Sequence, residues 1–189
     1  SYEAEYAAIR KGVGIFHMPQ RGLIEVKGPD RAGFLNQLLS NDVGSLIFER
    51  GCRSFLLDAR GRIAADLIVL QSDQSTWLDL DRLQAPKCVS DLDRCVFAED
   101  IEIVDQSSAF VHIALHGPAA ARLIKETASF AMSDLTPLSH THLTFNGQRC
   151  LVYRRDETGS LGLHMLVPND AAEEVYRKLA DVGGGLVPD

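Results

Sequence analysis

The chain has 189 residues, enough for one domain or two small ones with a buried core. Its 46% hydrophobic and 24% charged residues are ordinary for a globular protein, and its formal charge of −7 argues against nonspecific nucleic-acid binding. No apolar run is long enough for a membrane span, and Glu3 and Glu5 interrupt any signal peptide. We therefore expect a cytoplasmic protein without nucleic-acid or membrane partners.

Cysteines and histidines give no metal signature. The four cysteines contain no Cys-x-x-Cys pair and are expected to be reduced thiols rather than a zinc or dithiol site: Cys52, Cys88, Cys95 and Cys150. His140 and His142 would share a strand face but lack an obvious third ligand. His112 and His116 lie on a predicted strand and its end, where they would not converge as two helical ligands do. The sequence therefore predicts no metal site.

The first half of the chain alternates strands and helices. A short amphipathic helix is expected over Tyr2–Arg10, followed by a strand over Leu23–Val26. Gly28-Pro29 then ends the strand and starts a helix, because proline at a first helical position needs no donor. A hairpin is expected next, with its turn at Asp58–Gly61 and its second strand over Ile63–Leu70.

Three further elements complete that half. Thr76–Leu80 alternates side chains as a strand does, Arg82–Phe97 has the composition of a helix with Pro86 in or near its first turn, and Ile101–Val104 forms another strand. A chain of this kind needs helices that cover one face of an antiparallel sheet.

The second half repeats this plan. A strand over Phe110–Leu115 runs into His116-Gly117-Pro118 and a helix, as in the first half. A hairpin follows around Asn146-Gly147, then a strand over Leu161–Val167 and a helix capped by Asn169. We interpret this as an internal duplication, which predicts an α+β fold with antiparallel sheets and helices on one face, ferredoxin-like in each half.

Two stretches resemble a known family. Gly28-Pro29-Asp30 with Asn41-Asp42-Val43, and the run from Leu57 to Val69, look like the folate-binding superfamily of the glycine cleavage T-protein, which includes the YgfZ-type proteins. The resemblance implies that the two halves interlock. We expect residues 1–23 to pack on the second half, residues 24–105 to form the first half and residues 106–189 the second. The C-terminal barrel of the family is absent from these 189 residues.

The resemblance also implies where chemistry takes place. In the aminomethyltransferases of this family two adjacent aspartates follow the hairpin turn, and the first faces the reactive folate nitrogen. Here that pair reads Ala65-Asp66, so the strand is expected to present a methyl group where transferases have an acid. Neighbouring strand residues project to opposite faces, so Asp66, the candidate catalytic residue, replaces the missing acid only if a one-residue bulge redirects it.

A second departure is Ser160, which stands where the family has a glutamate that binds the pterin. A hydroxyl provides neither the charge nor the two-oxygen fork of a carboxylate. Arginines around both hairpins could receive the anionic tail of folate or could simply aid solubility. The candidate residues for binding tetrahydrofolate or a derivative are therefore Ala65, Asn41, Asp42, Arg62, Ser160 and Arg155.

Three functional hypotheses follow. The leading one is a tetrahydrofolate-binding protein closer to the YgfZ-type accessory proteins of iron-sulfur cluster maintenance, because Gly61–Asp66 resembles that branch more than the transferases. The alternative is an aminomethyltransferase that moves a one-carbon unit from a lipoyl carrier protein to tetrahydrofolate. The third is a noncatalytic scaffold that no longer binds folate. A lipoyl carrier or an iron-sulfur protein is the partner that the first two hypotheses imply.

Overall fold

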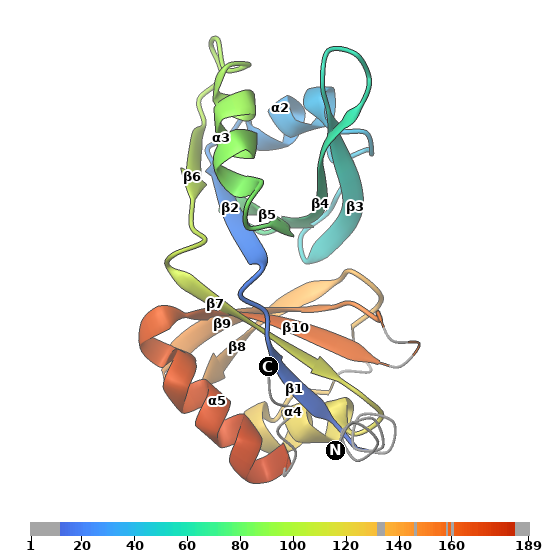
Figure 1. Ribbon diagram of the computed structural model, residues 1–189, viewed down its shortest axis with the longest axis vertical. Coiled ribbons are helices and arrows are strands. Elements are labelled where there is room, and N and C mark those ends of the chain that lie inside the picture. The colour runs from blue at the N-terminus through green and yellow to red at the C-terminus, as the bar shows by residue number, and fades with distance from the viewer. Residues whose placement is uncertain (1–11, 132–134, 146, 158, 160, 184–189) are drawn as a thin grey trace. The chain divides into compact units, whose positions relative to one another are not determined.

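The chain divides into two compact units, each described by itself. The computed structural model describes residues 12–131, 135–145, 147–157, 159 and 161–183, so the helix expected at Tyr2–Arg10 lies outside the described residues. The middle unit is Pro19–Ser108. The terminal unit combines Ser1–Met18 with Ala109–Asp189, and Figure 1 shows its N-terminal strand beside strands from the later part of the chain.

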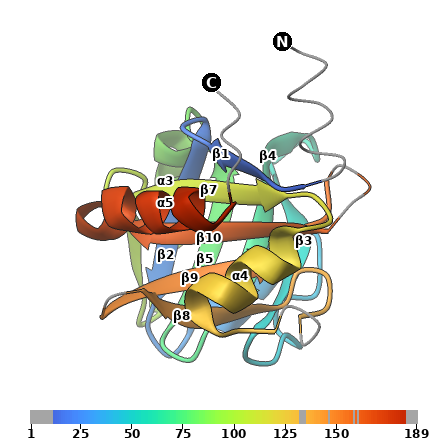
Figure 2. The same ribbon diagram turned by 90° about the horizontal axis from the view of Figure 1, so that it is seen from below.

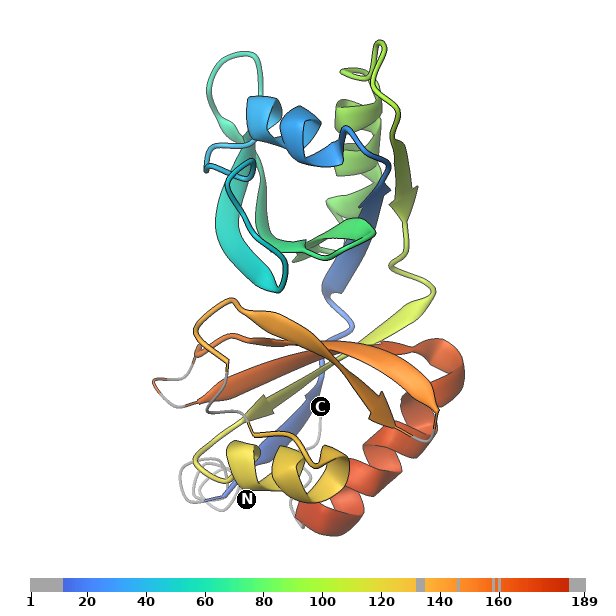
Figure 3. The same cartoon turned by 180° about the vertical axis from the view of Figure 1, so that it is seen from behind.

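The middle unit has one five-stranded antiparallel sheet with the strand order β3-β4-β5-β2-β6. Its elements in chain order are β2 (Arg21–Lys27), α2 (Arg31–Leu38), β3 (Arg50–Leu57), β4 (Ile63–Gln71), β5 (Ser75–Asp81), α3 (Ala85–Asp93) and β6 (Glu102–Asp105). Both helices cover the same face of the sheet (Figure 3).

The terminal unit has a second five-stranded antiparallel sheet with the order β1-β7-β10-β9-β8. Its elements are β1 (Gly14–His17), β7 (Phe110–His116), α4 (Ala120–Ala128), β8 (His140–Phe145), β9 (Gln148–Arg154), β10 (Gly162–Pro168) and α5 (Asn169–Gly183). Helices α4 and α5 lie on one face of this sheet, as Figure 2 shows.

The two sheets have the same topology, which confirms the predicted α+β duplication. In the middle unit β2 lies between β5 and β6, and in the terminal unit β7 lies between β10 and β1. Strand β1 therefore takes the place in the terminal unit that β6 takes in the middle unit, although it comes from the other end of the sequence. This exchange is the interlocking that the family resemblance implies. Beyond the four strands of a ferredoxin-like unit, each sheet carries one extra edge strand, β3 or β8.

Each unit has its own apolar core between the sheet and its helices. In the middle unit Phe34 and Leu35 of α2 and Leu92 of α3 pack against Val26 and Leu78 of the sheet. In the terminal unit α4 and α5 pack in the same way, with cluster members Leu123, Ile124, Val175, Leu179, Leu115 and Met165. Burial of these side chains stabilises each unit by about 25 cal/mol per Å² of apolar surface removed from water.

The helix expected over Arg82–Phe97 is shorter, because α3 spans only Ala85–Asp93. Before it, the Asp81 carboxylate accepts a hydrogen bond from the Leu83 backbone N–H at 2.8 Å and forms a turn. The apolar side chains of Leu83 and Phe97 are 90% and 89% exposed. Neither side chain lies on the face of α3 that packs in the core. Their apolar character therefore predicted a longer helix than the one that forms.

The two Gly-Pro turns have the same conformation. Gly28 and Gly117 have φ angles of 99° and 128°, in the region that favours glycine. A Cβ atom on Gly28 would lie 2.0 Å from the Asp100 backbone oxygen. Glycine is therefore required there by the backbone angle and by a close contact between the turn and the chain before β6.

We predict that Gly28→Ala lowers the free energy of unfolding by about 2 kcal/mol or more, because it combines backbone strain with this clash. Gly33→Ala is the matched control. No atom lies within 4 Å of a Cβ built on Gly33, which lies inside α2, so this change should stabilise the protein by up to about 1 kcal/mol. Urea denaturation of both variants measures the difference, and equal effects would contradict the assignment of the turn.

Candidate functional site

The β3–β4 hairpin has an irregular register beside the predicted aspartate. Leu56 pairs with Ala65, whereas Leu57 pairs with Ile63, so Ala64 is an extra residue in β4. A single extra residue of this kind is a β-bulge, and it resets which face each following side chain occupies. The one-residue bulge on which the predicted role of Asp66 depends is therefore present at Ala64, one residue before Ala65.

Beyond the bulge, Ala65 faces the helices. Its side chain is 2% exposed and belongs to the core cluster with Leu67 and Val69. Asp66 alternates with these residues and therefore projects from the opposite face of the sheet. Ala65 therefore faces the helices, and the carboxylate of Asp66 projects from the sheet face opposite them; that a methyl group stands where transferases have an acid stays a prediction.

Asp66 is paired with Arg53 of the neighbouring strand. The Arg53 Nε donates to Asp66 Oδ1 at 2.9 Å, and an Arg53 terminal nitrogen donates to Oδ2. This bidentate arrangement fixes the carboxylate plane. The side chain of Asp66 remains 45% exposed, and the Arg53 guanidinium also lies 5.6 Å from the centre of the Phe55 ring. The pKa of Arg53 is raised, chiefly by its hydrogen bond to Asp66.

Asn41 lies close to this pair. Its Nδ2 donates to the Arg53 backbone oxygen at 3.1 Å, and its backbone N–H donates to Ser54 Oγ at 3.0 Å. Asp42 caps the next turn by accepting from the Ser45 N–H at 3.1 Å. Arg53 therefore contacts Asn41 through its backbone oxygen and Asp66 through its guanidinium, and Asp42 follows Asn41 in the chain.

The loop that carries Asn41 is also fixed to α2. The Asn36 Oδ1 accepts hydrogen bonds from the backbone N–H groups of Val43 and Gly44, both at 2.9 Å. One side-chain oxygen therefore satisfies two backbone donors that no helix or strand uses.

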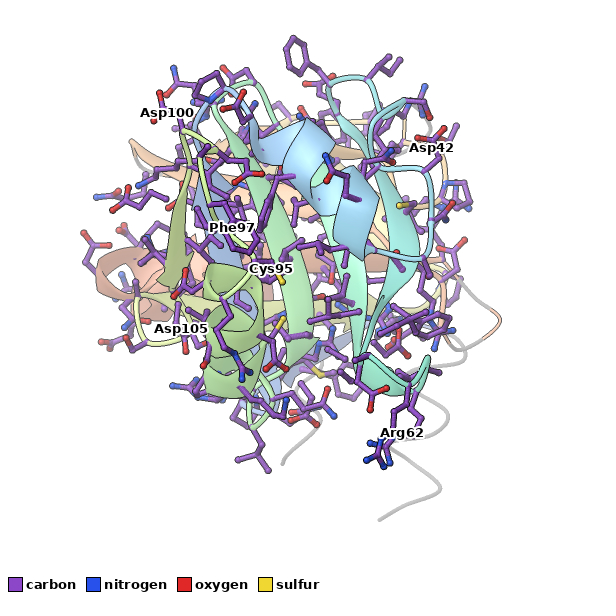
Figure 4. All side chains as sticks on the ribbon, turned by 90° about the horizontal axis from the view of Figure 1, so that it is seen from above. Asp42, Arg62, Cys95, Phe97, Asp100 and Asp105 are labelled. Atoms are coloured by element: carbon purple, nitrogen blue, oxygen red, sulfur yellow. The ribbon has the colours of Figure 1, made fainter. Side chains whose placement is uncertain are left out.

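Arg62 is separate from Asn41 and Asp42. Its Nε donates to Asp58 Oδ2 at 2.8 Å, within the turn of the hairpin. The pKa of Asp58 is lowered, chiefly by the hydrogen bond from the Arg62 backbone N–H. Figure 4 shows Arg62 at the end of the hairpin, apart from Asp42.

The remaining two candidates belong to the terminal unit. Arg155 pairs with Glu157, with an Arg155 terminal nitrogen 2.5 Å from Glu157 Oε1. Ser160 lies outside the described residues. Of the predicted set, the structure thus groups Asn41, Asp42 and Asp66 in one unit, buries Ala65 in the core beside them, and engages Arg62 and Arg155 in local ion pairs.

The carboxylate of Asp66, oriented by Arg53, is the acidic group of this candidate site. Comparison with known proteins gives the family of the chain. Residues 1–188 match the model described as the GCVT N-terminal domain. The chain belongs to this family.

Relatives and solved structures agree with the assignment. An aminomethyltransferase of Alkaliphilus oremlandii is 30% identical over 98% of the chain and 51% of the relative, and that of Bacillus subtilis is 28% identical over 100% and 53%. The chain thus spans about half the length of these relatives.

Two solved structures have the same fold. Aminomethyltransferase T of the glycine cleavage system from Bartonella henselae superposes with a TM-score of 0.82 at 24% identity, over 94% of the chain and 48% of that structure. A chain of the heterotetrameric sarcosine oxidase from Corynebacterium sp. U-96 superposes with a TM-score of 0.70 at 15% identity, over 96% and 90%. At these identities the likeness shows the fold alone.

Within this GCVT N-terminal domain, Arg53 is one of the hairpin arginines that the sequence offers as receptors for the anionic tail of folate, but its ion pair with Asp66 was not predicted. Its position two residues before Phe55 on an edge strand was the available signal, since both then share a face. The partner of Arg53 on β4 is Asp66, and this pairing depends on the register at the bulge, which the sequence does not reveal.

None of the described helices is both long and apolar enough to cross a membrane.

We predict that Asn36→Ala lowers the free energy of unfolding by about 1–3 kcal/mol, because two backbone donors lose their acceptor. Asn36→Asp keeps an oxygen at the same place and should recover much of the loss. Chemical denaturation measures both variants. Equal destabilisation by the two would show that the hydrogen bonds to the loop are unimportant.

Proposed function

We propose that this GCVT N-terminal domain binds tetrahydrofolate or a derivative and supports aminomethyl transfer to it, with Asp66 as the acidic group. One observation carries the proposal: the carboxylate of Asp66 lies on the sheet face opposite the helices and is 45% exposed, while Ala65 lies in the core. The names of the curated relatives support the same activity. They favour an aminomethyltransferase over the YgfZ-type accessory role, which remains the second hypothesis.

The reaction requires an acidic group close to the folate nitrogen that becomes positively charged. Transfer of the methylene unit breaks the C–N bond that releases ammonia and the C–S bond that returns the lipoyl thiol, and it forms two C–N bonds to folate nitrogens. The two protons that these nitrogens lose go to the ammonia and to the thiol, so protons must move at nitrogen. A carboxylate in hydrogen-bond reach accepts such a proton or stabilises the developing positive charge. Asp66 has the exposure for this role, and Arg53 holds its orientation.

Arg62 and Arg155 have a weaker claim as receptors for the anionic tail. Each already forms an ion pair, with Asp58 and Glu157 respectively. An incoming carboxylate would have to share or replace these partners, which offsets part of its binding energy. The proposal therefore rests on Asp66 and the Asn41 loop rather than on the arginines.

The test is turnover with tetrahydrofolate and an aminomethylated lipoyl carrier protein, read as ammonia release. Asp66→Asn should lower kcat about 10²- to 10⁴-fold, because the amide cannot take the proton, with little change in folate affinity. Asp58→Asn, in the turn of the same hairpin, is the matched control and should keep activity.

Each other outcome has a clear meaning. Saturable folate binding without ammonia release would support the accessory role and contradict the transferase. Absence of saturable binding at millimolar folate would leave the noncatalytic scaffold. Full activity of the Asp66→Asn variant would remove Asp66 from the mechanism.

A second prediction tests the opposite side-chain directions of Asp66 and Ala65. Ala65→Asp adds an acid but buries it in the apolar core, so we expect the free energy of unfolding to fall by about 3–5 kcal/mol with no gain in turnover. Ala64→Asp, at the half-buried bulge position, should destabilise less. Thermal unfolding measures both, and a stable, more active Ala65→Asp variant would contradict the assigned side-chain directions.

A further inference from the structure

Two histidines of the terminal unit lie together on the sheet face opposite the helices. His116 ends β7 and pairs with Gly162, while His164 of β10 pairs with Ala114. His164 is therefore two residues from the partner of His116, and both side chains project from the same face. Their ring centres are 5.4 Å apart with an interplanar angle of 81°. The two imidazoles thus meet nearly edge to face.

A carboxylate completes the group. Glu157, in the connection between β9 and β10, places its Oε2 3.9 Å from His116 Nε2 and 3.8 Å from His164 Nε2. Both separations are too long for hydrogen bonds. One ligand atom from each of the three residues lies within 4.8 Å of the others. The three ligand atoms therefore surround a common point and do not hydrogen-bond to one another.

Neighbouring residues orient Glu157 and His164 and hold the connection between β9 and β10 in place. Arg155 pairs with Glu157 Oε1 and leaves Oε2 directed at the imidazoles. His112 Nε2 and His164 Nδ1 are 2.9 Å apart, so a hydrogen bond between them fixes the His164 ring. Asp156 Oδ1 accepts from the Gly162 backbone N–H at 3.0 Å and secures the connection. Such partners of ligand residues are what metal sites use to set ring orientation.

Gly162 makes room for the first imidazole. A Cβ atom at this position would lie 2.7 Å from His116 Nδ1 and 2.1 Å from the Arg155 backbone oxygen. Only glycine therefore allows the His116 ring to lie against β10. The close contact fixes the ring where its Nε2 faces Glu157.

The two histidines of this group are buried, and its carboxylate is partly exposed. The His164 side chain is fully buried and the His116 side chain is 6% exposed, whereas Glu157 is 35% exposed. Burial lowers the pKa of His116 below its usual range. Glu157 leaves the group open to solvent on one side, which provides an entry path.

We propose that His116, His164 and Glu157 bind one divalent transition-metal ion of the zinc type, with water in the fourth position. Two imidazoles and one carboxylate suit Zn²⁺ and related ions, whereas Ca²⁺ and Mg²⁺ prefer oxygen alone. Bonds of about 2.0–2.2 Å in a tetrahedron place ligand atoms roughly 3.3–3.6 Å apart. The separations of 3.8 and 3.9 Å from Glu157 Oε2 need a contraction of only a few tenths of an ångström, whereas the imidazole ligand atoms, which lie within 4.8 Å of each other, would have to approach by up to about 1.5 Å.

The sequence did not predict this site because its members are not neighbours in the chain. His116 and His164 meet through the pairing of β7 with β10, and Glu157 reaches them from a loop. His112 and His116 lie four residues apart in the sequence, and in the structure the ring of each contacts His164.

The experiment uses untagged protein that has been stripped of metal by a chelator and dialysed. Calorimetric titration with Zn²⁺ should give one ion per chain, and Co²⁺ should give the visible absorption of a tetrahedral complex. Zinc should also raise the Tm, because the ion binds the folded chain. Folate is absent throughout, so failure here is separate from failure of the proposed function.

Three variants assign the ligands. His116→Gln, His164→Gln and Glu157→Gln should each weaken Zn²⁺ binding by at least about 100-fold. His17→Gln removes an exposed histidine of β1 and should leave binding unchanged. Glu157→Gln is half-exposed and nearly isosteric, so it tests the site even where a buried histidine variant fails to fold. Absence of stoichiometric Zn²⁺ binding, or unchanged affinity in Glu157→Gln, would overturn the proposal.

Discussion

The alternation of side chains along β4 determines how the middle unit can work. The extra residue at Ala64 sets the phase, after which Ala65, Leu67 and Val69 pack under the helices and Asp66 projects from the other face. A one-residue change of phase would turn Asp66 toward the helices, together with Ile68 and Leu70, and would turn Ala65, Leu67 and Val69 toward the other face. Packing of the core and presentation of the acid are therefore one constraint, and Arg53 on β3 adds the ion pair that orients the acid.

The two similar units differ in the side chains that their sheets carry on the face opposite the helices. Both use the same strand order and the same Gly-Pro turn, but the face opposite the helices has an aspartate–arginine pair in the middle unit and a histidine–glutamate group in the terminal unit. A shared fold positions the strands, and the side chains on the open face decide what can bind.

Much of the fold was predictable because its signals are local. The Gly-Pro turns, the hairpins and the repeated order of elements all follow from residues adjacent in the chain, and β1 alone needed the family resemblance to be placed with the second half. Helix ends were less predictable, as Leu83 and Phe97 show: their apolar character suggested a longer helix, yet both are exposed.

The site was less predictable, because it depends on register. The sequence predicts Asp66 and Ala65 as candidate site residues but not the faces they occupy, since a bulge leaves no clear mark in Ile63-Ala64-Ala65. Asn41 could be named from the resemblance, yet its contact with Arg53 requires the fold. The group around His164 depends on pairing between strands and on a loop conformation, neither of which spacing in the chain encodes.

The most direct measurement is thiol labelling of A65C and D66C variants, followed by mass spectrometry of the peptide that contains each new cysteine. The account predicts that the native protein with D66C is labelled rapidly by a water-soluble reagent. It also predicts that A65C is labelled only after unfolding. Rapid labelling of A65C with protection of D66C would contradict the central claim, because it would place the methyl group on the open face and the carboxylate in the core.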